Sequence, residues 1–181
     1  MTIRAVARAL HVAPNALYSY VESRTALLDA LLDDLLADVA APAPATDDPV
    51  AGVHQLMSST FDVLTAAPDL VPVYLSRQGA RGPNAVRLGQ VMDALLDRAG
   101  VDPSWVPEAR RVLIVHTIGA AAFATAPTAE ADATQTLPAR QVRDSFHRSL
   151  HWLLAGITET PSPAGPNANR HHDAARLGPS P

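Results

Sequence analysis

Residues 2–36, TIRAVARALHVAPNALYSYVESRTALLDALLDDLL, decide the fold of this chain. Apolar side chains recur at the i, i+3, i+4, i+7 spacing of a helix in residues 2–10, and a second short helix is predicted over residues 15–21. The segment from His11 to Pro14 breaks the pattern between them. Two short helices joined by such a turn form a helix-turn-helix. Ordinary packed helix pairs have the same spacing, so the pattern alone leaves two interpretations open.

The polar residues of this segment favour contact with DNA. In helix-turn-helix units that bind DNA, the second helix enters the major groove. Its outward residues here are Asn15, Tyr18 and Ser19. Tyrosine hydroxyls and the guanidinium of Arg24 suit phosphate oxygens, and so do the free amides at a helix start near Thr2. The whole chain has a formal net charge of −4, so a general attraction of its surface to nucleic acid is not expected.

The same segment resembles the helix-turn-helix of TetR-family transcriptional regulators, and within the family it is most similar to the tetracycline-repressor-like branch. In that branch Leu-Tyr, a two-residue gap, Val, another gap, a basic residue and ALLDAL follow in this order, as they do here. The resemblance covers residues 2–36 without a gap. It implies an all-α protein in which a helix-turn-helix precedes a helical body for ligand binding and dimerisation.

The resemblance also implies which residues contact DNA. The expected phosphate contacts are Thr2, Tyr18, Tyr20 and Arg24. The residues expected to face the bases are Ala13, Pro14, Asn15 and Ser19. Only Asn15 and Ser19 can hydrogen-bond to a base edge, because alanine and proline offer little beyond apolar contact with a thymine methyl. The implied protein is a repressor that binds a palindromic double-stranded operator as a homodimer and is released by a small organic effector.

Two departures from the family pattern bear on this expectation. His11 stands where the turn usually has glycine, although histidine tolerates a left-handed backbone better than most residues. The family's first helix has no counterpart before residue 2, so we expect weakened DNA binding and a genuine start further upstream. The alternative is a truncated relative that dimerises and binds a ligand but no longer binds DNA. A band-shift assay on this chain and on an upstream-extended version separates the two.

The rest of the chain is also predicted to be helical. We expect the DNA-binding module and its connecting helix in residues 1–40, a ligand-binding and dimerisation domain in residues 50–157, and a disordered, proline-rich tail in residues 158–181. The proline-rich stretch 41–49 is interpreted as a linker. Helices are predicted over residues 24–39, 50–65, 69–78, 84–99, 106–125 and 139–157.

The connecting helix 24–39 carries leucines on two sides, with Asp29, Asp33 and Asp38 expected to face water. It can therefore pack on both modules, and we predict that an effector acts by moving it. Helices 106–125 and 139–157 are the most apolar, and two from each of two chains can form a four-helix interface. The alternative is that these faces only close the core of one chain.

A small, largely apolar effector is expected to bind among the helices of residues 50–125. Mostly apolar walls with a few polar groups are typical of such sites. The candidates are polar or aromatic residues on otherwise inward faces: His54, Met57, Ser58, Phe61, Tyr74, Gln78, Met92, His116 and Phe123.

Composition and motifs argue against other functions. No Gly-x-Ser-x-Gly sequence, glycine-rich phosphate loop or paired-carboxylate motif indicates an enzyme. His147 and His151 have an i, i+4 spacing that can bind metal, but no third ligand follows, so neither a metal nor a cofactor is predicted. The chain has no cysteine, no signal-peptide layout and no long apolar run, and we expect a cytoplasmic protein without membrane contact.

Overall fold

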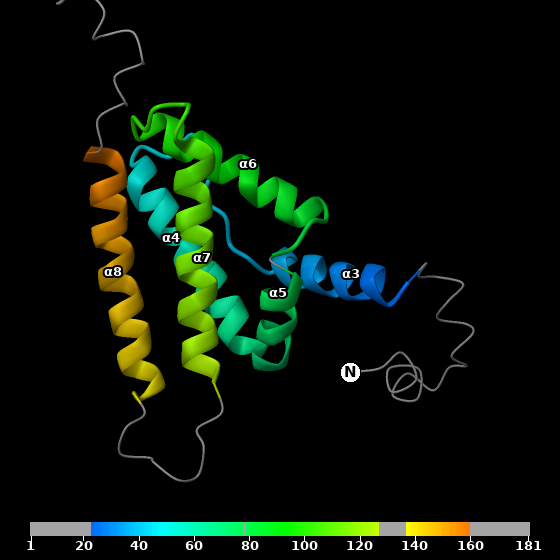
Figure 1. Cartoon of the computed structure of the whole chain (residues 1–181). Helices are drawn as coiled ribbons and strands as arrows, with labels where there is room; N and C mark the ends of the chain where they lie inside the picture. Colours follow the sequence, from blue (N-terminus) through cyan, green and yellow to red (C-terminus); the bar gives the residue numbers. More distant parts are fainter. Residues whose placement is uncertain (1–22, 78, 127–136, 160–181) are drawn as a thin grey trace, which may run out of the picture.

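The computed structural model describes residues 23–77, 79–126 and 137–159, and every regular element in these ranges is helical (Figure 1). This confirms the predicted all-α fold class. The elements in chain order are α3 (Arg24–Ala37), α4 (Pro49–Ala66), the short 3-10 helix η1 (Pro68–Leu70), α5 (Val71–Arg77), α6 (Pro83–Arg98), α7 (Val106–Thr125) and α8 (Ala139–Glu159).

Local capping interactions set where the first two of these helices begin. The hydroxyl of Ser23 accepts a hydrogen bond from the backbone N–H of Ala26 at 3.0 Å, which satisfies a free amide in the first turn of α3. The carboxylate of Asp48 does the same for Ala51 at the start of α4, at 2.9 Å. Pro49 follows at the first helical position, where the missing amide costs nothing. The residues at these two positions therefore account for where α3 and α4 begin.

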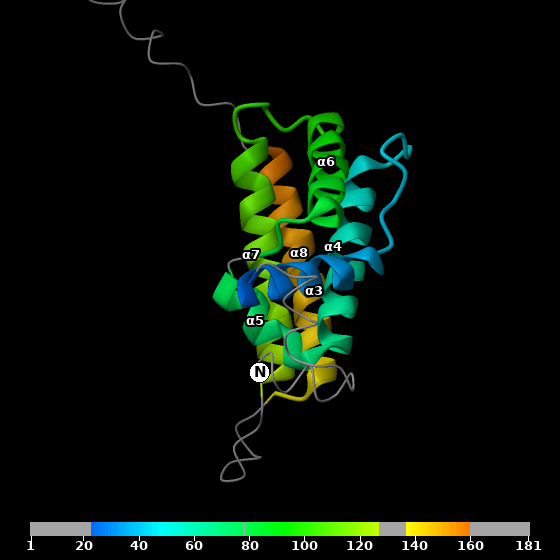
Figure 2. The same ribbon diagram turned by 90° about the vertical axis from the view of Figure 1, so that its right-hand side faces the viewer.

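Helix α4 lies at the centre of the body and packs against α6, α7 and α8. Its buried residues include Val53, Leu56 and Phe61, each at most 1% exposed. Helices α7 and α8 run side by side along the body, while α3 lies across it beside α5 and α6 (Figures 1 and 2). The crossing helix buries Leu32 and Leu36 against this body. Helix α3 is thus packed against the helical body of residues 49–125.

The carboxylates of α3 do not all face water as predicted. Asp38 is exposed, but Asp33 is only 6% exposed and accepts hydrogen bonds from the start of α6. Asp29 is half-buried and accepts two hydrogen bonds from the guanidinium of Arg77, each at 2.7 Å. The prediction failed because apolar periodicity places a polar residue on the outer face, whereas here a neighbouring element supplies polar partners for it.

Helix α7 is apolar on nearly all sides, a pattern that indicates burial on most of them. In the described chain its outer face is open instead, with Val115 and Phe123 62% and 63% exposed. Trp152 on the adjacent α8 is 69% exposed. None of the helices in the described ranges is long and apolar enough to cross a membrane.

Candidate functional site

A cavity of about 400 Å³ lies between α4, α5, α6 and α7, beneath the end of α3. Most of its walls are aliphatic side chains and methionines, with a few polar groups between them. This is the composition expected of a site for a small organic molecule. Its lining residues on α3, α4 and α5 are Leu36, Leu56, Met57, Thr60 and Tyr74; the remainder are Gly79, Ala80, Arg81, Ala85, Val86, Leu88, Gly89, Gln90, Met92, Asp93, Arg110, Ile114, Thr117 and Ile118.

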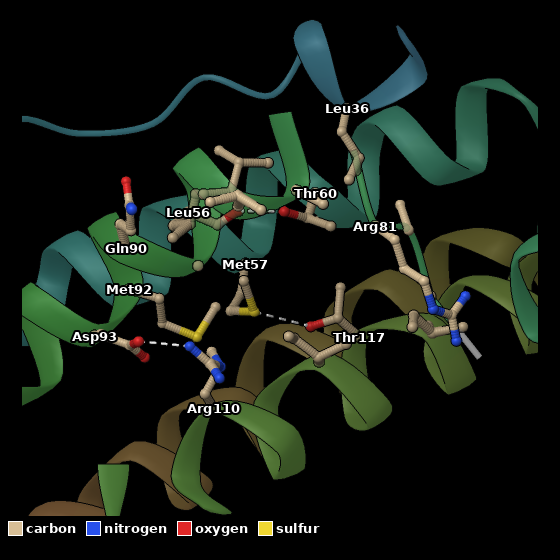
Figure 3. Close-up of a pocket in the computed structure, with 18 of the residues that line it drawn as sticks. Leu36, Leu56, Met57, Thr60, Arg81, Gln90, Met92, Asp93, Arg110 and Thr117 are labelled. Carbon is tan, nitrogen blue, oxygen red and sulfur yellow. Dashed lines mark hydrogen bonds and ion pairs between the residues drawn. The ribbon is translucent and has the colours of Figure 1, made fainter. Parts of the chain in front are cut away.

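The middle of the cavity is formed by soft and neutral groups (Figure 3). Met57 and Met92 contribute thioethers, which are polarisable and adapt to flat or irregular ligands. The buried hydroxyl of Thr117 donates to the carbonyl of Leu113 at 2.8 Å and also lies 3.4 Å from the sulfur of Met57. Burial raises the pKa of Tyr74, so its phenol remains protonated and neutral.

Charged groups lie on two sides of the cavity. In Figure 3, Asp93 and Arg110 lie on one side and Arg81 on the other, with Met57 and Thr117 between them. Nη1 of Arg110 is 2.5 Å from Oδ2 of Asp93, an ion pair that joins α6 to α7. The guanidinium of Arg81 donates to the backbone carbonyl of Arg77 at 2.8 Å. The cavity can therefore offer polar contacts without being a charged cleft.

The wall formed by the start of α6 is bonded directly to α3. Oδ1 of Asp33 accepts from the backbone N–H of Ala85 at 3.0 Å, and its Oδ2 accepts from the backbone and side-chain N–H groups of Asn84 at 3.2 and 3.1 Å. A Cβ built on Gly82 would lie 2.2 Å from Cγ of Asp33, so only glycine permits this approach. We call Asp33, Gly82, Asn84 and Ala85 the α3–α6 latch.

The structure brings three of the nine predicted ligand-binding residues to the cavity: Met57, Tyr74 and Met92. His54 and Ser58 lie on another side of α4, where the Ser58 hydroxyl is 3.4 Å from Nδ1 of His54 and 3.3 Å from Nδ1 of His147 on α8. Their position makes them part of the α4–α8 contact rather than of the cavity.

Three further candidates also lie away from the cavity. Phe61 stacks on Phe146 of α8 with ring centroids 4.4 Å apart. His116 stacks on the same ring and lies 2.9 Å from the hydroxyl of Ser149 through Nε2. Phe123 points to the exposed outer face. Gln78, the ninth candidate, is outside the described residues.

Most of the predicted DNA contacts are also outside the described residues. These are Thr2, Ala13, Pro14, Asn15, Tyr18, Ser19 and Tyr20. Arg24 is the first residue of α3 and is exposed. The assignment of these eight residues to DNA contacts stays a prediction.

Sequence reasoning missed the charged residues of the cavity. Arg81, Asp93 and Arg110 were not among the candidates, because a charged residue on a helix or in a loop is most often solvated. The loop containing Arg81 and the pairing of Asp93 with Arg110 depend on contacts between separate elements. In the sequence, only the opposite charges of Asp93 and Arg110 could have indicated that these two residues form an ion pair.

The architecture defines a class of protein: a helical body with a mostly apolar cavity and a crossing helix bonded to its wall. Several solved structures with a similar fold are described as transcription regulators. The putative transcription regulator SCO7704 of Streptomyces is 28% identical over 90% of this chain and 86% of its own, with a TM-score of 0.66. The TetR-family protein ActR of Streptomyces coelicolor, in complex with (S)-DNPA, is 20% identical over 87% of this chain and 88% of its own, with a TM-score of 0.70.

BioQ of Mycobacterium smegmatis is 23% identical over 87% of this chain and 86% of its own, with a TM-score of 0.71. BioQ has also been solved with its natural double-stranded DNA operator. Neither a protein-family model nor a curated protein sequence matches the chain. The chain has a TetR-like fold, in agreement with the resemblance seen in residues 2–36.

Proposed function

We propose that the chain is a ligand-responsive transcriptional repressor, which binds a palindromic operator as a homodimer and releases it when a small organic effector fills the cavity. The observation that carries the proposal is the α3–α6 latch. The first turn of α6 lines the cavity through Ala85 and Val86, and the same turn is capped by Asp33 of α3. A ligand that shifts this turn therefore acts directly on α3.

A second connection runs from the cavity to α3 through the loop after α5. Arg81 lines the cavity and donates to the carbonyl of Arg77, while Arg77 donates two hydrogen bonds to Asp29. The latch and this ion pair contact residues one turn apart on the same face of α3. Displacing Arg81 and α6 together would tilt α3, whose first residue, Arg24, follows the two helices predicted for the helix-turn-helix.

The solved structures with the same fold support both halves of the proposal. ActR is in complex with (S)-DNPA, and BioQ with a double-stranded DNA operator. We carry over only the classes of partner: a small organic molecule for the cavity and double-stranded DNA for the segment before α3. No cofactor is needed for such a switch, because a difference in affinity between two arrangements of the helices is sufficient.

Dimerisation would use the exposed face of α7 and α8. On α7 it contains Val112, Val115 and Phe123, and on α8 it contains Trp152. A Cβ built on Gly119 or Gly156 would meet no atom within 4 Å, so a partner helix can approach closely there. Two copies related by a two-fold axis would bury this face as a four-helix interface.

The test begins with DNA and ends with the effector. Selection from a random double-stranded DNA pool should give the full chain a palindromic site, which a band-shift assay at one fixed salt concentration then confirms. A thermal-shift screen against antibiotics and metabolites identifies the effector. Saturating effector should weaken DNA binding by about five- to 150-fold, the usual range for coupled sites. Unchanged DNA affinity would overturn the proposed mechanism.

Two variants separate the latch from the cavity in that experiment. Asp33→Leu should still bind the effector but lose most of its influence on DNA binding. Asp62→Leu removes an exposed carboxylate that pairs with Arg143 between α4 and α8, and should keep both properties. A chain that dimerises and binds an effector but selects no DNA would favour the alternative, a relative without DNA-binding activity.

A further inference from the structure

One oxygen in the cavity wall has no hydrogen-bond partner. Oδ1 of Asp93 is shielded from solvent and accepts no hydrogen bond, and it is the one buried side-chain oxygen or nitrogen of this kind in the described part of the chain. The other oxygen of the same carboxylate, Oδ2, accepts a hydrogen bond from Arg110. Buried polar groups are almost always paired, and an ionised carboxylate is especially costly to leave half-satisfied. The exception lies at the wall of the mostly apolar cavity between α4, α5, α6 and α7.

The carboxylate can present this oxygen to a ligand. The side chain of Asp93 is 39% exposed overall and lines the cavity, so only a turn about the Cβ–Cγ bond is needed. That torsion is soft in aspartate. A partial turn brings Oδ1 out of its shielded position toward the cavity, and the further N–H groups of Arg110 can keep Oδ2 bound.

Arg110 supplies complementary donors beside this acceptor. A guanidinium has five N–H donors, and the bond to Asp93 uses one of them. Gly89 leaves room at this point, since a Cβ built on it would lie 3.7 Å from Nη1 of Arg110. Asp93 and Arg110 together form a polar anchor with an acceptor and donors side by side, which we call the Asp93–Arg110 anchor.

We infer that the cavity takes a neutral, flat, mostly apolar molecule that carries a hydrogen-bond donor next to an acceptor, as in a primary carboxamide, and that the Asp93–Arg110 anchor receives this end. The inference rests on the proposed effector site and names its ligand class. The ligand donor binds Asp93, its acceptor faces Arg110, and its apolar body lies against Met57 and Met92.

Two other ligand classes fit less well. At the anchor, a carboxylate would place a second negative charge beside Asp93, whose own charge already balances that of Arg110. A carboxylate held instead by Arg81, on the other side of the cavity, would appear as tightest binding of the anion in the test below. A molecule without polar groups would leave Oδ1 unpaired and bury it further, which costs affinity. The Asp93–Arg110 anchor therefore favours a ligand that has a hydrogen-bond donor in addition to its apolar surface.

The test compares three probes of nearly the same shape on the full chain by isothermal titration calorimetry. Naphthalene-2-carboxamide has the donor and the acceptor, methyl naphthalene-2-carboxylate has only the acceptor, and naphthalene-2-carboxylate is an anion. The wild type should bind the carboxamide about tenfold or more tightly than the ester, because the ester leaves Oδ1 without a partner. The anion should bind more weakly than the carboxamide.

Variants assign the preference to the anchor. Asp93→Leu should bind carboxamide and ester with affinities within about twofold of each other, whereas Asp93→Asn, which keeps a carbonyl oxygen, should retain part of the preference. Asp62→Leu, which removes a carboxylate from an ion pair outside the cavity, should behave as the wild type. Circular dichroism of each variant shows whether it is folded.

Three outcomes overturn the inference: equal affinity of wild type for carboxamide and ester, tightest binding of the anion, or no binding of any probe at about 1 mM. A preference that survives Asp93→Leu would also overturn it. None of these measurements involves DNA. A chain that prefers the carboxamide but selects no operator would refute the proposed repressor and leave the ligand class standing.

Discussion

Oδ1 of Asp33 on α3 accepts a hydrogen bond from the backbone N–H of Ala85 on α6 at 3.0 Å, across 52 positions of sequence. The residue is 6% exposed, so the bond is made away from solvent. It belongs to a cap in which the carboxylate also binds Asn84. A negative charge at a helix start is favourable both for the free amides and for the helix dipole. Helix α3, which leads toward the expected DNA-binding segment, therefore supplies the carboxylate that caps the start of α6, and α6 lines the cavity.

We expect Asp33→Leu to lower the free energy of unfolding by about 1–3 kcal/mol. The substitution removes the acceptor of buried amide donors and leaves them without partners. Urea unfolding followed by circular dichroism measures the loss. Asp38→Leu, at the exposed end of the same helix, is the matched control and should stay within about 0.5 kcal/mol of wild type. Equal effects of the two substitutions would show that the latch contributes no stability of its own.

Gly82→Ala should destabilise the protein by about 1–3 kcal/mol, the usual range for an overpacked contact. The new Cβ would lie 2.2 Å from Cγ of Asp33, so α3 and the start of α6 must move apart. Gly89→Ala tests the same exchange further along α6, where the nearest atom would be 3.7 Å away. It should be neutral or stabilising by about 0.5–1 kcal/mol, because alanine is the better helix former. Thermal unfolding of both variants checks the contrast.

Stability should decrease when the pH falls below about 6.5, and His54 should account for part of the decrease. Burial is the main cause that lowers the pKa of His54 in the folded chain, and the nearby charge of His147 lowers it further. The rings are stacked with centroids 5.6 Å apart. The unfolded chain therefore binds a proton at His54 more readily than the folded chain does. The stabilising contribution is fully present above the unfolded pKa and is lost as the pH falls toward the folded one.

Urea unfolding between about pH 7.5 and about pH 5.5 measures this dependence. His54→Gln should make stability less sensitive to pH over that range, since it removes one group whose proton uptake differs between the two states. Burial lowers the pKa of His116 as well, so some sensitivity should remain in the variant. If the free energy of unfolding depended on pH in the same way in His54→Gln as in the wild type, groups other than His54 would account for the dependence.

The helices could be predicted from sequence because their periodicity and caps are local. Residues 106–125 were predicted as one helix and form α7 with the same bounds, and the helix predicted to begin at residue 24 begins there, capped by Ser23. The predicted helix 69–78 is divided instead into η1 and α5. Pro68 directly precedes this stretch and Pro72 lies within it, and proline removes a backbone donor from a continuous helix.

The cavity could be predicted only in part, because periodicity says which side of a helix is apolar but not which neighbour covers it. Met57 and Phe61 are four residues apart on α4, yet one lines the cavity and the other stacks on α8. On α7 nearly every side is apolar, so the pattern could not show that Phe123 is exposed. The burial of Asp33 could not be predicted from the sequence, because it depends on the close approach of Gly82 to α3.

The last prediction concerns the proposed dimer. The full chain should sediment as a dimer at micromolar concentration, and Trp152→Asp should shift it to monomer, since a charge in an apolar interface must be desolvated without a partner. Leu75→Asp is the matched control: Leu75 is also exposed, at 48%, but lies on α5, away from the α7–α8 face. In a Trp105→Phe background Trp152 is the only tryptophan, so its emission should move to shorter wavelength as the protein concentration rises. A wild-type chain that remains monomeric at micromolar concentration would contradict the dimer, as would a Leu75→Asp variant that dissociates as readily as Trp152→Asp.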